Sequence, residues 1–163
     1  MCGYNLCCNS CCMTPVFGGI YNNSAVTYEY EEGEHQTVIL DVPMYTKNVD
    51  ATVGTLTPKD SGYYLVFMNA DAKQTAGSEG AWQIELDVND SPEGYYTQTV
   101  TAPVGQTDKL AKTGIVQIAA GSTLSLKAFS NDPTSRLEID DAHLSLVKIA
   151  DSDPVCNCGC NCK

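Results

Sequence analysis

Cysteine is the residue type with the most evident chemistry in this 163-residue chain, and all nine cysteines lie close to the two ends. They are Cys2, Cys7, Cys8, Cys11 and Cys12 near the start, and Cys156, Cys158, Cys160 and Cys162 near the end. Thiols form disulfides, bind soft metal ions or exchange electrons. Because the central part of the chain holds no cysteine, this chemistry does not staple its core.

The cysteines of the last segment recur at every second residue, in the sequence CNCGCNC. In an extended chain this period points all the thiols to one side, so neighbouring cysteines do not easily pair with each other. An odd total also leaves one thiol over unless bonding is intermolecular or a metal is bound. A body of this size folds without disulfides, so we expect intermolecular cross-links through these nine residues.

Three alternatives for the cysteines stay open. A thiolate cluster for Zn²⁺ or Cu(I) is chemically reasonable, although the two C-x₂-C pairs usual in structural zinc sites are missing. Cys8 and Cys11 form one C-x-x-C pair, but no βαβ pattern accompanies it as in redox proteins. Inert or locally paired tails are the third reading.

The central part lacks a catalytic pattern. The only histidines, His35 and His143, are far apart in sequence, and no G-x-S-x-G motif occurs. We therefore expect no enzymatic activity, and surface or inter-strand roles for both histidines.

Calcium is the remaining ligand to consider for the central part. Asp87, Asn89 and Asp90 form one oxygen-rich cluster, and Asp140-Asp141 lies near Glu138. Such residues could hold Ca²⁺, but residues of this kind also form turns. We expect no bound cofactor, with Zn²⁺ or Ca²⁺ as the exceptions to test.

Charge narrows the set of partners. The formal net charge is -11, and lysine and arginine form no cluster that could follow a phosphate backbone. No segment approaches the length of apolar sequence that crosses a membrane, and the first residues do not resemble a secretory signal peptide. We expect no nucleic-acid or membrane partner, and no Sec-dependent export.

Composition divides the chain into a cysteine-rich N-terminal arm at 1–13, a body at 14–150 and a cysteine-rich C-terminal tail at 151–163. Hydrophobicity in the body has a period of two, which predicts strands and no helix. The predicted strands are 37–42, 51–56, 63–70, 82–88, 95–101, 114–118, 123–129 and 137–149, the last interrupted near Asp140-Asp141. Eight or so short strands with frequent turns favour an antiparallel two-sheet sandwich of the jelly-roll kind.

Two tyrosine pairs, Tyr63-Tyr64 and Tyr95-Tyr96, each begin a predicted strand. Consecutive strand residues point to opposite faces, so one tyrosine of each pair should be exposed. Exposed tyrosines suit subunit contacts, and we take all four residues as candidates for a subunit interface.

Three stretches of the body resemble the C1q/TNF-like jelly-roll domain. They are 54–67 (GTLTPKDSGYYLVF), 114–126 (GIVQIAAGSTLSL) and 143–149 (HLSLVKI), and the likeness covers roughly 35–149. Ser122 departs from the pattern, which often has aspartate there. The resemblance implies a jelly-roll fold and a tight trimer.

Within that family the chain looks most like structural proteins of bacterial spore surfaces and appendages, although it has no Gly-X-Y repeat. This resemblance implies a self-assembling subunit of a surface fibre or layer, made in the mother cell and cross-linked by disulfides. Its partners would be other copies, as a trimer or helical polymer, and other cysteine-rich spore-coat proteins. The alternatives are a carbohydrate-binding or adhesive tip module tethered by its tails, and a thiolate metal-binding protein.

Overall fold

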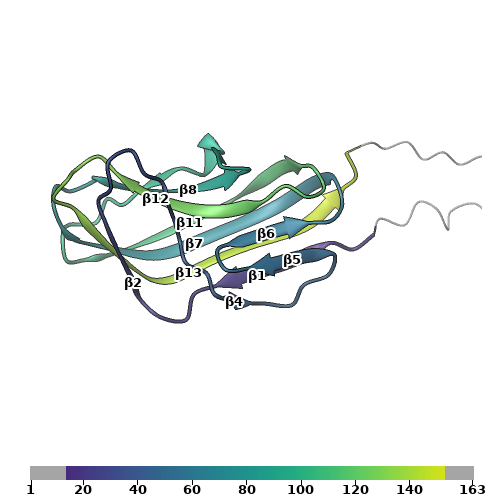
Figure 1. The fold of residues 1–163 in the computed structure, drawn as a ribbon, viewed down its shortest axis with the longest axis horizontal. Coiled ribbons are helices and arrows are strands. Elements are labelled where there is room, and N and C mark those ends of the chain that lie inside the picture. Colours follow the sequence, from purple (N-terminus) through teal and green to yellow (C-terminus); the bar gives the residue numbers. More distant parts are fainter. Residues whose placement is uncertain (1–13, 153–163) are drawn as a thin grey trace, which may run out of the picture.

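The computed structural model describes residues 14–152, which form two antiparallel β-sheets packed face to face (Figure 1). Within this range the only helical element is a short 3-10 helix, η1 (Gly94–Tyr96). The prediction of an all-β, two-sheet sandwich is therefore confirmed. The arm at 1–13 and the tail from 153 onward lie outside the described residues.

The first sheet, sheet A, has six strands in the order β11-β7-β13-β1-β4, with β2 also paired to β13. Its strands are β1 (Phe17–Tyr21), β2 (Val26–Glu29), β4 (Val42–Pro43), β7 (Gly62–Ala76), β11 (Thr107–Ile118) and β13 (Arg136–Ala150). The two 15-residue strands β7 and β13 run side by side through its centre.

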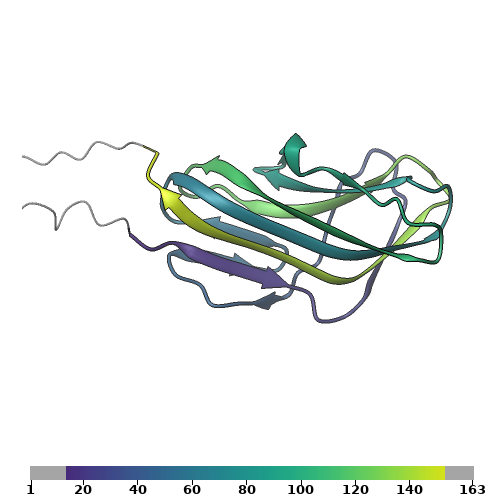
Figure 2. The same ribbon diagram turned by 180° about the vertical axis from the view of Figure 1, so that it is seen from behind.

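The second sheet, sheet B, has seven strands in the order β10-β8-β12-β6-β5, with β3 paired to β12 and β9 paired to β8. Its strands are β3 (Gln36–Thr37), β5 (Val49–Thr52), β6 (Thr55–Pro58), β8 (Trp82–Val88), β9 (Ser91–Pro92), β10 (Gln98–Thr99) and β12 (Leu124–Ser130). Figure 2 shows from behind how the two sheets enclose the interior.

The core lies between the sheets and follows from the alternation of the strands. Trp82, Ile84 and Leu86 of β8 point inward, and Tyr64 and Val66 of β7 are equally buried on the facing sheet. Each large apolar side chain buried in this way stabilises the fold by roughly 1.5–3 kcal/mol. Residues 14–152 contain no cysteine, so no disulfide joins two strands of this core.

Several predicted strands are confirmed, and some are longer than predicted. The bounds of β8 agree with those predicted, and β7 and β11 extend the predicted strands. The expected interruption near Asp140-Asp141 is a register shift between Ile139 and Asp141 inside a continuous β13. A β-bulge of this kind bends a strand without ending it.

Other predicted strands were wrong. Residues 51–56 hold the turn between β5 and β6, and 37–42 mostly run as irregular chain from β3 to β4. Residues 95–101 contain part of η1 and the two-residue strand β10, so Tyr95 and Tyr96 lie in a helical turn and begin no strand. Strands β1 and β2 were not predicted either, and in β1 the two glycines resemble a bend.

Candidate functional site

Both ends of the described chain leave the sandwich at the same place. β1 and β13 are antiparallel neighbours, with Phe17 opposite Val147, and the Lys148 N–H donates to the carbonyl of Val16 at 2.8 Å. The first strand therefore begins where the last strand ends (Figures 1 and 2). The two cysteine-rich segments consequently join the body at one end of the sandwich.

A buried lysine forms an ion pair with the chain that follows β13. The Lys148 side chain is only 4 % exposed, and its ammonium group lies 2.5 Å from the carboxylate of Asp151. Gly62 lies against the same point, because a Cβ there would come within 2.5 Å of Lys148 and of the Ala150 carbonyl. The start of β7 therefore packs closely against the end of β13.

An apolar row crosses the outer face of sheet A beside this end. Ile115, Leu65, Val147 and Phe17 lie in register on the neighbouring strands β11, β7, β13 and β1. Ile115 is 62 % exposed and Phe17 41 % exposed, while Leu65 and Val147 are partly buried. We call these four residues the apolar row.

Further apolar side chains extend the apolar row in both directions. Phe67 lies two residues along β7, and Tyr63 and Ile149 lie toward the chain ends, all partly exposed. Contiguous apolar surface of this kind marks an interaction face more often than isolated exposed residues do. This outer face is the candidate functional site.

A shallow groove adjoins the apolar row on the side of sheet A where β1 pairs with β4. Phe17, Met44, Tyr45 and His143 are among its lining residues, and its volume is about 240 Å³. The His143 Nε2 lies 3.2 Å from the Met44 sulfur, and burial lowers the pKa of the imidazole. His143, in β13, therefore contacts the chain that follows β4 at the surface, and a surface role is one that the sequence predicted.

The tyrosine pairs divide as predicted, with one member of each pair buried. Tyr64 and Tyr96 are inside the core, where burial raises the pKa of each to about 12. They offer no surface to a partner, so the expectation that these two are subunit-interface residues was wrong. For Tyr63 and Tyr95, both exposed, it stays a prediction.

Tyr95 lies at the β11 edge of sheet A, against the face of β11 opposite to that of Ile115, since a Cβ on Gly114 would meet its ring at 2.8 Å. Its hydroxyl donates to the carbonyl of Thr113 at 3.3 Å, and the Lys112 ammonium lies 4.5 Å from the centre of its ring. Tyr95 is therefore exposed at this edge but does not belong to the apolar row.

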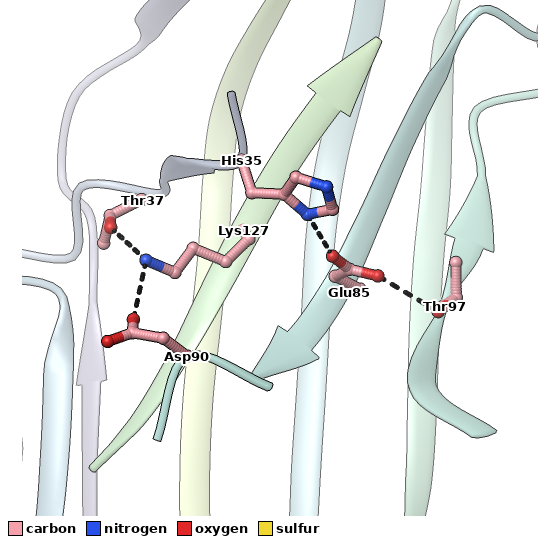
Figure 3. Close-up of polar contacts among 6 residues, drawn as sticks. All are labelled: His35, Thr37, Glu85, Asp90, Thr97 and Lys127. Carbon is pink, nitrogen blue, oxygen red and sulfur yellow. Dashed lines mark hydrogen bonds and ion pairs between the residues drawn. The ribbon is translucent and has the colours of Figure 1, made fainter. Parts of the chain in front are cut away.

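Sheet B carries a polar cluster on its outer face (Figure 3). The His35 Nδ1 lies 2.6 Å from a carboxylate oxygen of Glu85, and its ring stacks on Phe129 at 4.3 Å. The other oxygen of Glu85 accepts from the Thr97 hydroxyl at 3.3 Å. His35 thus links the connection before β3 to β8 on the surface of sheet B, in agreement with the surface role expected from the sequence.

The alternation of β8 predicted solvent on the face of Glu85 and Asp87, but both residues are only 3 % exposed. His35, from the connection between β2 and β3, contacts Glu85, and it lines one pocket together with Asp87. This connection is remote in sequence, so alternation within β8 could not reveal it. Lys127, from β12, completes the cluster by contacting Thr37 and Asp90.

Asn89 is committed to a turn. Asn89 and Asp90 both have positive φ, 55° and 57°, and form the two-residue hairpin between β8 and β9. Asparagine and aspartate favour this turn. The Asn89 side chain donates to the Ser122 hydroxyl and accepts from the Thr123 N–H. Turn formation therefore accounts for Asn89 without calcium.

Two predictions remain, a metal site in the body and the chemistry of the terminal cysteines. Among residues 14–152, no three His, Cys, Asp or Glu side chains lie together in a way that could hold a metal ion. The nine cysteines lie outside the described residues, so the cross-linking and thiolate predictions stay predictions. None of the helical structure described is long or apolar enough to cross a membrane.

Sequence comparison gives no relative: no family model and no curated protein matches the chain. Structural comparison does. The sandwich is similar to Eiger TNF from S. frugiperda, with a TM-score of 0.60 at 16 % identity over 86 % of this chain and 95 % of that one.

Two further solved structures are similar. Murine APRIL has a TM-score of 0.55 at 12 % identity, over 82 % of this chain and 99 % of that one. The globular domain of zebrafish complement 1qA protein has 0.54 at 11 % identity, over 83 % and 98 %. At such low identity the likeness concerns the fold. The chain has the jelly-roll fold of TNF and C1q domains, as the resemblance of its sequence implied.

Proposed function

We propose that this protein is a self-assembling structural subunit of a bacterial surface fibre or layer, in which disulfides between the cysteine-rich ends link neighbouring copies. One observation carries the proposal. The apolar row lies at the end of the sandwich where both cysteine-rich segments join the body. An association surface and the residues that could lock it are thus close together.

Association would begin at the apolar row. Ile115 and Phe17 expose apolar area that a neighbouring copy would remove from water, at about 25 cal/mol for each Å² buried. Tyr63, on the same face of β7 as Leu65, would supply a rigid aromatic contact at the margin. The overall charge of -11 opposes this contact, so association should strengthen as salt screens the repulsion.

Covalent linkage would follow association. Two cysteine thiols from neighbouring copies lose two electrons and two protons to an oxidant such as molecular oxygen, and one S–S bond forms. The arm of 13 residues can reach about 45 Å when extended, which is enough to reach a neighbouring subunit. Bonds of this kind would make the assembly resistant to denaturants.

The symmetry of the assembly decides its form. A trimer, implied by the resemblance to C1q/TNF-like domains, would close on itself, whereas a contact between unlike surfaces would continue into a helical polymer. The spore surface is the location we propose, because the sequence resembles structural proteins of spore surfaces and a protein released there meets oxidising conditions. Other cysteine-rich coat proteins would be further partners.

Electron microscopy of the purified, air-oxidised protein tests the proposal. We expect fibres or sheets of regular repeat that survive dilution, and their loss when a thiol reductant is present throughout purification. Single domains under both conditions would contradict the proposal. The same sample gives the symmetry, since trimers and filaments differ in two-dimensional class averages.

A further inference from the structure

β11 is the outermost strand of sheet A, so one of its edges has no strand beside it among the described residues. In an antiparallel pair, alternate residues turn both their N–H and their C=O away from the neighbouring strand. In β11 these are the odd-numbered residues, because the carbonyls of Ala111 and Thr113 accept hydrogen bonds at this edge from the side chains of Gln98 and Tyr95. The register with β7 has no bulge, so the same alternation continues to the end of β11.

The segment at 95–102 covers part of this edge. Besides the two side-chain contacts just named, the N–H groups of Thr101 and Ala102 donate to the carboxylate of Asp108, at 2.7 and 3.1 Å. The segment therefore lies beside β11 from Asp108 to Thr113. A strand from another molecule cannot pair with β11 over that stretch.

Beyond Thr113 the edge is open. The next two residues whose backbone turns outward are Ile115 and Gln117, and no described residue forms a hydrogen bond with their N–H or C=O groups at the edge. Ile115 is 62 % exposed, and Gln117 is exposed as well. Two donors and two acceptors in one line are a template for a further strand.

The open stretch lacks the features that keep the edge of a natural sheet unpaired. Residues 113–118 read TGIVQI, with no charged residue and no proline, whereas the covered part of β11 contains Lys109 and Lys112. Lysine, proline and bulges are the usual means of blocking an edge. A stretch without acidic residues also suits contact between two copies that each carry a formal charge of -11.

We propose that β11 pairs with β11 of a second copy, antiparallel over residues 114–118, about a two-fold axis at Val116. This inference rests on the proposed self-assembly, and it names the strand and the symmetry of one contact. Ile115 would lie opposite Gln117 of the second copy, and Gln117 opposite its Ile115. Each of these pairs exchanges two N–H···O hydrogen bonds, as in any antiparallel ladder. The contact is isologous, because both copies use the same residues.

The covered parts of the two strands do not obstruct this pairing. Thr113 would lie opposite Ala119 of the second copy, which follows the end of β11. Neither covering segment therefore has to move. Ile115 also belongs to the apolar row, so the rows of the two copies would adjoin on one face of a continuous sheet.

Hydrogen exchange of the backbone amides, measured by NMR on the full chain kept reduced, tests the pairing. Between micromolar and millimolar protein concentration, we expect exchange at Ile115 and Gln117 to slow at least about tenfold, because their N–H groups become paired. Val116 and Ile118 turn their N–H groups toward β7 and should exchange slowly at every concentration. These two amides are the internal control.

A pair of variants at one position tests the role of the backbone. Gln117→Pro removes an outward N–H and spares the bonds to β7, and an edge strand tolerates proline. Since the two-fold axis doubles the loss, the dissociation constant should rise at least about tenfold. Gln117→Val changes the side chain but keeps the N–H, so it should associate like the unaltered protein. Slow exchange at Val116 in both variants shows that the sandwich is folded.

Four results would overturn the pairing. Association without slower exchange at Ile115 and Gln117 would exclude the strand contact and leave the proposed self-assembly standing. Slow exchange that does not depend on concentration would mean that a segment of the same chain covers the edge. Equal association of Gln117→Pro and Gln117→Val would show that the outward N–H is not used. A reduced protein that stays monomeric up to millimolar concentration would exclude the pair altogether.

Discussion

Phe17 lies directly opposite Val147 in the antiparallel pairing of β1 with β13, and both side chains lie on the outer face of sheet A. The pair joins the first strand of the body to the last. It also places part of the apolar row where the two cysteine-rich segments join the sandwich. Assembly through this end of the molecule depends on that relationship.

The first prediction concerns the apolar row. Ile115→Glu should raise the dissociation constant for self-association of the reduced protein at least tenfold, roughly the effect of losing a central contact residue. Because Ile115 is 62 % exposed, the fold itself should tolerate the change. Sedimentation equilibrium under reducing conditions measures the effect.

Val53→Glu is the matched control for that experiment. Val53 is 67 % exposed, similar to Ile115, but it lies in the turn between β5 and β6 of sheet B. The control introduces the same charge and should associate like the unaltered protein. If the two variants behave alike, the apolar row is not the association surface.

The second prediction concerns the close contact at the chain end. In Gly62→Ala the new methyl group would lie 2.5 Å from the Ala150 carbonyl and from Lys148, so the end of β13 must move. We expect the free energy of unfolding to fall by about 1–3 kcal/mol, as is typical when a side chain is enlarged at a tightly packed position. In a domain of this size each kcal/mol lowers the melting temperature by roughly 2–4 °C.

Gly94→Ala provides the comparison for Gly62→Ala. A methyl group added at Gly94 would have no neighbouring atom within 4 Å, and the φ of this glycine is not positive. The melting temperature of this variant should therefore change little. If the melting temperature falls equally in both variants, the close contact of Gly62 with the end of β13 does not contribute to the stability of the fold.

The third prediction concerns Asp87 and pH. Its folded pKa is raised above the ordinary value of 3.8 by burial and by Glu85. The folded state therefore keeps this proton more firmly than the unfolded state. The associated stability is present in full below the unfolded pKa and is lost as the pH rises through the folded pKa. Asp87→Asn, which resembles the protonated form, should gain stability relative to the unaltered protein over that interval.

Asp132 should show the opposite dependence. Its carboxylate accepts hydrogen bonds from the N–H groups of Thr134 and Ser78, which lower its pKa. Stability from this group is present above the unfolded pKa and is lost as the pH falls through the folded pKa. Thermal melts of Asp87→Asn and Asp132→Asn at several pH values test both signs, and slopes of the same sign would contradict this assignment.

Much of the fold could be predicted because its strands carry their own signal. Alternation in β8 indicated its bounds, since Trp82, Ile84 and Leu86 all face one core. β1 could not be predicted in this way, because Gly18 and Gly19 are unlike strand residues. Contacts with residues distant in sequence explain why glycine stands in this strand. A Cβ on Gly19 would lie 3.0 Å from the Met44 sulfur and from Ser145.

The candidate site was visible only in part. The run 63–68, YYLVFM, is apolar at every position, which indicates that β7 has an apolar outer face as well as an inner one. The register that aligns Leu65 with Ile115 and Val147 depends on strands distant in sequence. The contact of Glu85 with His35 depends likewise on the connection between β2 and β3, and so escaped prediction.

The fourth prediction is the most direct test of the central claim, that the terminal cysteines link copies of this chain. The measurement is a denaturing gel of air-oxidised protein, alkylated before denaturation and run with and without reductant. Beside it runs a variant with all nine cysteines changed to serine, which keeps both cysteine-rich segments at full length. We expect a ladder of high-mass bands that collapses on reduction and is absent from the serine variant. A single monomer band for the oxidised protein in every lane would contradict covalent assembly.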